Sequence, residues 1–495
     1  MLRVLAVTQM GGSASTTPAA TPVVRRRIVF IVTALGAFMA SLDLSIVNVA
    51  FPALERSFPS DPRATLAWVI TSYGIVFGSL LVIAGRTADR LGSRRVFMVG
   101  LTIFTVGSAL CGLAPSVAFL VAGRVIQGFG AAALLPASLS LLLGAFPVER
   151  RSQVVALWGG VGALAVATGP SLGAALITAG GWRSAFFVNV PIGVVAWFAG
   201  RRVLVNSRAG TPGVAPDYLG AALIALTLSA LVLGITEGPT WGWTSAPVLG
   251  CFAGAVVVGA GFLYRSAHHP EPVLDLTLFK ARSFSVANAA TFLYAMGFFA
   301  MLLGNILFLT SVWHYPILEA GLAVTPGPLV VAVVSGPAGR VASRVGFRRV
   351  LLVGFTVFFA GLVWFATRVG LQHDYLTVWL PGTLIIGLGI GLTFPVLSAA
   401  AVSSLHPNRF AVGSAVNQTA RQIGGAFGIA LLVVILGTPN TLANALTAFH
   451  HLWWYAAATA LLSGLACTLI SHKPRAQAEA ISPVAAPAAD TRVAV

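Results

Sequence analysis

Charged side chains are scarce in this sequence of 495 residues, and acidic ones are the scarcest. Charged residues make up 9% of the chain, with 13 Asp and Glu in all, against roughly 25% charged residues in a typical globular protein. So few charges cannot solvate the surface of a soluble molecule of this length. Apolar residues make up 57% of the chain. The composition therefore excludes a soluble globular protein and predicts an integral membrane protein with many spans.

The sequence also lacks the residue patterns of several other classes of protein. Its three cysteines, Cys111, Cys251 and Cys467, lie far apart within apolar stretches, which fits neither a disulfide framework nor a metal site. It contains no Gly-x-x-x-x-Gly-Lys-Ser/Thr motif, so ATP-driven pumping by this chain is excluded. We therefore expect no enzymatic activity, no cofactor and no bound metal.

The net charge of +17 comes from basic residues in short clusters between long apolar runs. This distribution argues against a nucleic-acid partner, which would meet a continuous basic face. A bilayer core needs about 20 apolar residues per helix, and a β-barrel would show strands of about ten alternating residues. The sequence instead predicts fourteen transmembrane helices. Their approximate bounds are 28–51, 66–86, 96–114, 117–143, 153–179, 184–204, 217–238, 246–264, 285–312, 320–340, 350–368, 377–403, 411–437 and 449–471.

The basic residues also predict which side of the membrane each loop faces. With the N-terminus inside, the cytoplasmic loops and tails hold 24 of the 30 basic residues and the opposite side holds four. Cytoplasmic loops carry the excess of Arg and Lys. We therefore expect a multi-pass protein of the cytoplasmic membrane with both termini in the cytoplasm. The tails at 1–27 and 472–495 are rich in small residues and proline, which predicts disorder.

Two loops of the sequence repeat each other 254 positions apart. The first runs from Gly85 to Arg95 and the second from Gly339 to Arg349, with glycines and arginines at matching places. Two six-helix halves of parallel topology are the architecture of one large transporter class. We predict halves at 28–204 and 285–471, joined by a linker at 205–284 that contains two additional transmembrane helices at about 217–264.

The first of these loops resembles the signature cytoplasmic loop of the major facilitator superfamily. Residues 42–52, 123–128, 182–193 and 417–425 are similar to motifs of its fourteen-helix drug:proton antiporters, the group of multidrug and quaternary-ammonium exporters. The resemblance covers about 28–471. It implies an all-α major facilitator fold of two six-helix halves plus two central helices, and proton-coupled efflux of amphipathic drugs by alternating access.

The glycine-rich helix at 153–179 resembles the antiporter motif of this group. The residues that carry the likeness are Gly162, Gly169, Pro170 and Gly173. Alanine stands at two glycine positions of the motif, Ala165 and Ala174, and preserves small size. Small residues permit tight helix crossing and Gly-Pro permits a kink. We predict gating here, although plain packing gives the same pattern.

Asp43 is the one carboxylate deep within an apolar span. An ionisable residue in the membrane is costly and is a functional candidate by default. Burial and a nearby cation shift the pKa of a carboxylate in opposite directions, so a site that faces each side in turn can bind and release a proton. The alternative is a structural carboxylate held by Ser41, Ser45 or Asn48, but these lie on another face of the helix. We predict that Asp43 carries the coupling proton.

Arg124 is the complementary charge in the helix at 117–143. A guanidinium is always charged, so inside a bundle it needs a carboxylate, carbonyl groups or water. The resemblance places Arg124 near the proton pathway, with Gln127 one turn later. We predict that Arg124 modulates the proton site, whereas the alternative is a clamp on backbone carbonyls that holds the bundle together.

The repeated loops predict a cytoplasmic latch between the halves, an expectation that rests mostly on the resemblance. Glycine permits close helix approach, and Asp89 can pair with an arginine or cap a helix across the loop. The alternative is that the arginines only anchor the topology. The predicted latch consists of Gly85, Asp89, Arg90, Gly92, Arg94, Arg95, Gly339, Arg344 and Gly346.

Several other polar or aromatic residues within the spans are candidates for a substrate cavity. They are Tyr73, Gln127, Tyr294, Asn305, Asn417 and Arg421. Asn417 and Arg421 lie at i and i+4, a spacing that also fits a packing site. Aromatic side chains suit an adaptable cavity, although many such residues face lipid.

The predicted partners are an amphipathic small-molecule substrate, protons and membrane lipid, and we expect a monomer. Two alternatives remain from the sequence. One is a major-facilitator transporter of a specific metabolite, which would need more buried hydrogen-bonding residues than the spans contain. The other is a non-transporting sensor or scaffold, which a large soluble domain would favour.

Overall fold

A computed structural model describes residues 23–205, 216–406 and 409–470. These residues form helices, one of them a short 3-10 helix (η1) and one a π-helical turn (η2), and none of them forms a strand. In chain order the helices are α1 (Val23–Ser57), α2 (Arg63–Leu91), α3 (Ser93–Gly112), α4 (Val117–Ala145), α5 (Val148–Gly180), α6 (Ser184–Phe187), α7 (Asn189–Val203), α8 (Tyr218–Trp241), α9 (Ala246–His268), η1 (Leu276–Lys280), α10 (Arg282–Ser311), α11 (Ile317–Val324), α12 (Pro326–Val345), α13 (Phe347–Arg368), η2 (Tyr375–Trp379), α14 (Leu380–Ser403), α15 (Phe410–Leu436) and α16 (Leu442–Cys467).

Thirteen helical segments of the described chain are long and apolar enough to cross a membrane. They match the first thirteen predicted spans in order. The last predicted span corresponds to α16, which has 26 residues but is more polar because it contains His450 and His451. The prediction of an all-α, multi-pass membrane protein is therefore confirmed.

The ends of some helices differ from the predicted spans, either near a proline or where a helix extends beyond the apolar segment. Two predicted spans are each divided into two helices, one at Val188 between α6 and α7 and the other at Thr325 between α11 and α12, although both residues keep helical backbone angles. Pro326 opens α12 at a position where a missing N–H costs nothing. At the N-terminus, α1 begins at Val23, so residues 23–27 are helical and not part of a disordered tail as predicted. The rest of both predicted tails lies outside the described residues.

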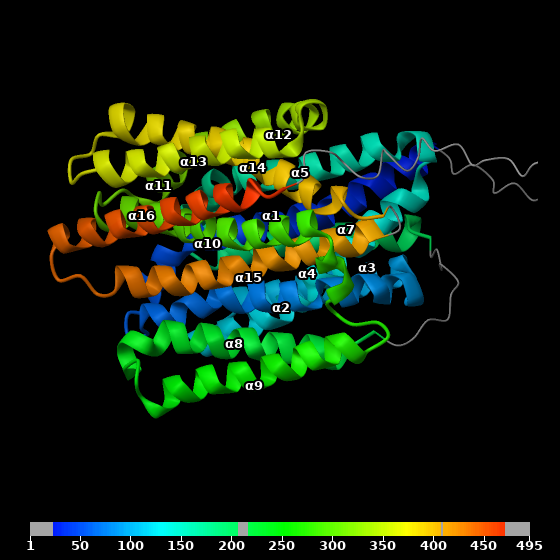
Figure 1. Cartoon of the computed structure of the whole chain (residues 1–495), viewed down its shortest axis with the longest axis horizontal. Coiled ribbons are helices and arrows are strands. Elements are labelled where there is room, and N and C mark those ends of the chain that lie inside the picture. Colours follow the sequence, from blue (N-terminus) through cyan, green and yellow to red (C-terminus); the bar gives the residue numbers. More distant parts are fainter. Residues whose placement is uncertain (1–22, 206–215, 407–408, 471–495) are drawn as a thin grey trace, which may run out of the picture.

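The helices form two packed groups, α1–α7 and α10–α16, with α8 and α9 on one side of the bundle (Figure 1). The groups meet where α2 packs along α15 and where α5 packs against α11 and α12. Helix α8 contacts both α2 and α15, and α9 packs chiefly on α8. The additional hairpin therefore covers one of the two seams between the groups. The boundaries of the halves at 204 and 285 are not tested by this packing and remain predictions.

Equivalent glycines bring equivalent helices together in the two groups. A Cβ added at Gly100 or Gly107 of α3 would lie within about 3 Å of α4. The same is true of Gly354 and Gly361 of α13, which pack against α14. These glycines are again 254 positions apart. The internal repeat therefore extends from the loops into helix packing, because only glycine lets the backbones approach so closely.

The repeated loops also share one backbone conformation. Gly92 has φ 93° and Gly346 has φ 96°, in a region that favours glycine because it has no Cβ. Each lies between two helices, α2 and α3 or α12 and α13. Gly92 and Gly346 are therefore required by the turn itself.

An ion pair holds the base of the additional hairpin. The Asp217 side chain accepts a hydrogen bond from the backbone N–H of Gly220 at 2.8 Å and caps α8. The Arg265 Nε at the end of α9 donates to the same carboxylate at 2.5 Å. Asp217 is buried, so this pair fixes the two helix ends next to each other.

The orientation of the hairpin can be tested by cysteine accessibility. We expect Thr244→Cys, at the α8–α9 turn, to react with a membrane-impermeant maleimide in intact cells. His268→Cys, at the other end of α9, should react only after permeabilisation, because the basic loops are predicted to face the cytoplasm. The background would carry no native cysteine. Labelling of both positions from outside would contradict the predicted topology.

Candidate functional site

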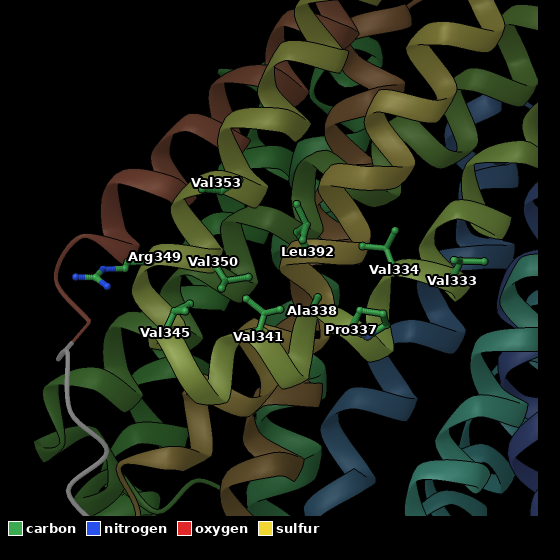
Figure 2. A pocket seen from close by; sticks show the side chains of 10 residues that line it. All are labelled: Val333, Val334, Pro337, Ala338, Val341, Val345, Arg349, Val350, Val353 and Leu392. Carbon is green, nitrogen blue, oxygen red and sulfur yellow. The ribbon is translucent and has the colours of Figure 1, made fainter.

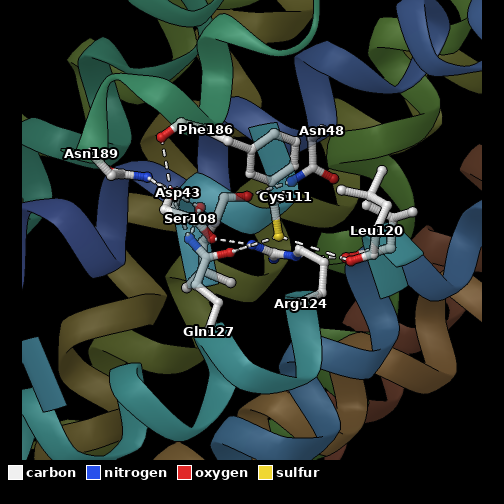
Figure 3. A network of polar contacts seen from close by, with 11 residues as sticks. Asp43, Asn48, Ser108, Cys111, Leu120, Arg124, Gln127, Phe186 and Asn189 are labelled. Atoms are coloured by element: carbon white, nitrogen blue, oxygen red, sulfur yellow. Dashed lines mark hydrogen bonds and ion pairs between the residues drawn. The ribbon is translucent and has the colours of Figure 1, made fainter. Parts of the chain in front are cut away.

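A fully buried ion pair lies in the middle of the N-terminal group. Asp43 is in the middle of α1 and Arg124 is near the start of α4, and neither side chain has any exposed surface. The Arg124 Nη1 donates to the Asp43 Oδ2 at 2.5 Å (Figure 3). Two charges are tolerated in such a place only when they neutralise each other and are hydrogen bonded.

Three further side chains complete the surroundings of the Asp43 carboxylate. The Gln127 Nε2 donates to the Asp43 Oδ1 at 2.8 Å, and the Asn189 Nδ2 of α7 lies at 3.4 Å from the same oxygen. Both amides also donate to the Ser108 Oγ of α3, at 3.2 and 3.1 Å. Helices α1, α3, α4 and α7 therefore share one buried polar network, shown in Figure 3.

Arg124 also contacts α2, a fifth helix. Its Nε donates to the Val69 carbonyl oxygen at 2.8 Å, and the Tyr73 ring centre lies 4.1 Å from its guanidinium carbon. Its Nη1 also donates to the Gln127 Oε1 at 2.7 Å. Both interpretations of Arg124 thus have a structural counterpart, since it pairs with a carboxylate and also binds a backbone carbonyl. Its Nη2 has no hydrogen-bond partner among the described residues.

The sequence pattern identified some of these residues and missed others. The residues near Asp43 in sequence are used elsewhere, since Ser45 donates to the Val166 carbonyl and Asn48 to the Leu44 carbonyl. Ser108 and Asn189 were not predicted as site residues. Asn189 lies in the stretch 182–193 that resembles a family motif. A single serine or asparagine in an apolar span is nevertheless common, and only the fold brings these two residues to Asp43.

The candidate cavity residues do not form one group. Tyr73 and Gln127 belong to the Asp43 network and are buried. Asn305 accepts a hydrogen bond from the Trp453 Nε1 at 3.0 Å and joins α10 to α16. Asn417 donates to the Thr291 Oγ1 at 2.8 Å and joins α15 to α10. Asn305 and Asn417 therefore link neighbouring helices of the C-terminal group.

Tyr294 and Arg421 lie together in a second region, between α10, α14 and α15. The Arg421 guanidinium carbon is 4.5 Å from the centre of the Phe394 ring. The Tyr294 ring packs against Phe394 at 6.4 Å and against Phe298, Phe355 and Phe358 at 5.6 to 5.8 Å. This region is aromatic and contains one cation.

The predicted latch residues lie at the two repeated loops. Asp89 is exposed, and no described residue forms an ion pair with it. The Arg94 Nη2 donates to the Arg201 carbonyl at 3.0 Å, which fastens α3 to α7. Gly85 is less crowded than predicted, since an added Cβ would meet only the Pro136 Cβ at 3.6 Å. A Cβ added at Gly339 would point into open space, with no atom within 4 Å beyond its chain neighbours and its own helix backbone.

Helix α5 packs on α1 next to the Asp43 network and also reaches the C-terminal group. A Cβ at Gly169 would collide with Ser45, and one at Gly173 would crowd Ile46. Gly162 lies near the Ser41 hydroxyl. On the opposite side, Gly321 of α11 sits against Pro170 and Ala174, closer than any larger residue would allow. The motif helix therefore connects α1 with the other half.

A surface pocket of about 420 Å³ lies between α12, α13 and α14, away from these polar regions. Figure 2 shows that its lining is apolar apart from Arg349, whose side chain points away from the valines. No predicted site residue lines it. Apart from Arg349, its lining has no group that could orient a polar ligand.

Comparison with known proteins places the chain in a family. A sequence model of the Major Facilitator Superfamily matches residues 33–429, with a second match over 287–492. The chain belongs to the major facilitator superfamily. The superfamily fold agrees with the solved structure of a D-xylose–proton symporter, which has a TM-score of 0.67 at 13% identity and covers 90% of this chain and 98% of the symporter chain.

Relatives in the superfamily are named for drug resistance. The chain is 33% identical over 410 residues to the multidrug resistance protein Stp of Mycobacterium tuberculosis (strain CDC 1551 / Oshkosh), covering 83% of this chain and 75% of that protein. It is 32% identical over 406 residues to the tetracenomycin C resistance and export protein of Streptomyces glaucescens, covering 82% and 75%. The fold and the relatives are those of transporters, which agrees with the expectation that the chain is not an enzyme.

The buried ion pair predicts a non-additive effect on stability. Arg124→Gln leaves the buried Asp43 carboxylate without its counter-charge, and Asp43→Asn does the same to the guanidinium. Each should therefore destabilise the protein by about 3–5 kcal/mol. The double variant should melt closer to wild type than either single variant. Thermal unfolding in detergent would measure this, with the partly exposed pair Arg63–Glu55 as control, where about 0–1 kcal/mol is expected. Additive losses at Asp43 and Arg124 would contradict the interpretation.

Proposed function

We propose that this protein exports amphipathic small molecules across the cytoplasmic membrane in exchange for protons. The observation that carries the proposal is the Asp43–Arg124 network. Among the described residues of the N-terminal half it contains the buried carboxylate and the buried arginine, and it lies beside the motif helix α5. The names of the relatives support drug export. The basic loops support an orientation with both termini in the cytoplasm, and we propose that the transporter acts as a monomer.

The first step that we propose is protonation of Asp43. A proton on this carboxyl removes the charge that neutralises Arg124, so the ion pair between α1 and α4 is lost. Arg124 keeps its hydrogen bonds to the Val69 carbonyl and to Gln127 and its contact with Tyr73. The guanidinium therefore stays partly satisfied, while the attraction between opposite charges on α1 and α4 is lost and the hydrogen bond from Gln127 to Asp43 is what still joins them.

The second step is movement of α1 relative to the other half. Helix α1 packs on Gly169 and Gly173 of α5, and α5 packs on Gly321 of α11. A shift of α1 is thereby passed to the contact between the halves. Asp43 is sealed in this conformation, so proton exchange requires rearrangement, which is the behaviour that alternating access needs.

Coupling can be tested in proteoliposomes with an imposed pH gradient and tetracenomycin C as the transported probe. Asp43→Asn keeps the shape of the side chain but cannot carry a proton. We expect it to abolish uphill transport and substrate-induced proton movement, while downhill exchange persists. Arg124→Lys should also impair coupling, because lysine lacks the planar fork that holds Asp43, Gln127 and the Val69 carbonyl.

The matched control is Asp217→Asn, since Asp217 is the other buried carboxylate of the described residues and is also paired with an arginine. It lies in the additional hairpin, so its loss should lower stability and leave coupling intact. Undiminished proton movement in Asp43→Asn would place the coupling site elsewhere. If both Asp43→Asn and Asp217→Asn lose proton movement, the cause is lower stability of the protein and not the loss of a proton-binding carboxylate.

We further propose that the repeated loops latch the cytoplasmic side in another stage of the cycle. Asp89 is the acidic member of the first loop and is exposed. An unengaged carboxylate beside so many arginines is available to pair or to cap a helix when the halves rock together. The fastening of α3 to α7 through Arg94 would then let the loop move with its half as one body.

We expect Asp89→Asn to lower the transport rate at least fivefold with normal insertion and stability. Gly85→Ala should be tolerated, because the added methyl meets only an ordinary contact. Initial transport rates, normalised to the amount of protein in the membrane, would measure both. Asp61→Asn, in the α1–α2 loop at the opposite end of α2, is the control and should behave as wild type. Wild-type transport rates in Asp89→Asn would contradict the latch and would mean that the loop only anchors the topology.

A further inference from the structure

Arg421 of α15 is a cation without a counter-charge. The described residues provide its guanidinium with no hydrogen bond and no ion pair, and its contact is with the face of the Phe394 ring at 4.5 Å. It is partly exposed, although its neighbours belong to the interior helices α10 and α14. Arg124, the other arginine within a span, has a carboxylate, a carbonyl and an amide as partners.

The buried carboxylates of the described chain are already neutralised. Asp43 and Asp217 are the two buried carboxylates of the described chain, and an arginine pairs with each. Glu237, which is partly exposed, lies in the additional hairpin and not in either half. The interior of the two halves therefore has an unneutralised positive charge and no unneutralised negative one, which disfavours a cationic ligand.

The surroundings of Arg421 favour an aromatic ligand. Phe394, which the guanidinium covers, belongs to a cluster with Tyr294 and Phe298, at 6.4 Å between ring centres in both cases. Tyr294 and Phe298 are stacked with an interplanar angle of 18°. Offset and edge contacts with such rings are favourable for a planar ligand. Asn417, one turn before Arg421, is already bonded to Thr291. Arg421 and the buried Tyr294 hydroxyl, which has no hydrogen-bond partner among the described residues, are the polar groups of the cluster that remain.

We propose that Arg421 binds the acidic group of the transported molecule, and that the substrates are aromatic amphipathic acids bearing a carboxylate or phenolate. The acidic group would form charge-assisted hydrogen bonds with the guanidinium, and the ring system would pack against Phe394 and Phe298. The inference rests on the proposed export of amphipathic molecules. It narrows the amphipathic drugs that the sequence resemblance implies to acids, and it differs from the quaternary-ammonium compounds after which part of that group is named.

Binding of three probes that share one ring system would test the proposal. They are 1-pyrenebutyrate, its methyl ester and a pyrene derivative with a trimethylammonium group, titrated by fluorescence against the purified protein in detergent without a pH gradient. We expect the acid to bind at least tenfold more tightly than the ester or the cation. Arg421→Gln should weaken binding of the acid at least tenfold and change binding of the ester less than twofold. Arg421→Lys should lie between.

Arg368→Gln is the matched control, because Arg368 also lies over an aromatic ring, Trp364 at 5.5 Å, but is exposed at the end of α13. It should bind all three probes as wild type does. Equal or tighter binding of the cation to wild type would overturn the proposal, as would full retention of acid binding in Arg421→Gln. If Arg421→Gln does not fold, the comparison of the three probes on wild type decides. Because no gradient is applied, a failure of proton coupling would leave this result unchanged.

Discussion

A charge in the membrane interior has to be neutralised where it lies, and in the N-terminal half Arg124 imposes this constraint on five helices. Its guanidinium reaches Asp43 of α1 and Val69 of α2, while the amides that complete the carboxylate come from α4 and α7. The polar atoms of these helices are therefore positioned by one ion pair. The members of such a buried network depend on one another. Packed interiors switch between discrete arrangements and do not deform gradually, which is the property that a proton-driven switch requires.

Much of the fold could be predicted from two features of the sequence. Membrane helices appear as long apolar runs, and the cytoplasmic loops between them are marked by clustered arginines. The repeat at Gly92 and Gly346 could also be predicted, because a turn with positive φ needs glycine at both places. The divisions at Val188 and Thr325 were not predicted, although Pro191 and Pro326 follow them closely, because proline is tolerated within transmembrane helices. The close packing of Gly100 and Gly354 was also missed, since a glycine in an apolar run does not reveal which helix it will contact.

Of the buried polar network around Asp43, the sequence most clearly predicted the charged residues. Asp43 and Arg124 stand out because an ionised group in a span is rare and costly. Ser108 and Asn189 carry no charge, so their meeting at the carboxylate depends on how α3 and α7 cross α1. Arg421 was predicted as a cavity candidate together with Asn417, one turn away, with a packing site as the alternative. The structure separates the two, since Asn417 is bonded to α10 while the guanidinium faces the Phe394 ring.

The charge of the substrate determines how strongly the membrane potential drives the proposed exchange. One proton entering for one neutral molecule leaving moves one charge, worth about 2.3 kcal/mol at 100 mV. If the molecule leaves as an anion, two charges move and the same potential supplies about 4.6 kcal/mol, enough for a concentration ratio of about three orders of magnitude. If it leaves as a monovalent cation, no net charge moves and only the pH difference remains, about 1.4 kcal/mol per unit. A paired carboxylate in one half and an unpaired arginine in the other thus favour an exporter driven chiefly by the potential, with acids as the molecules that gain most from it.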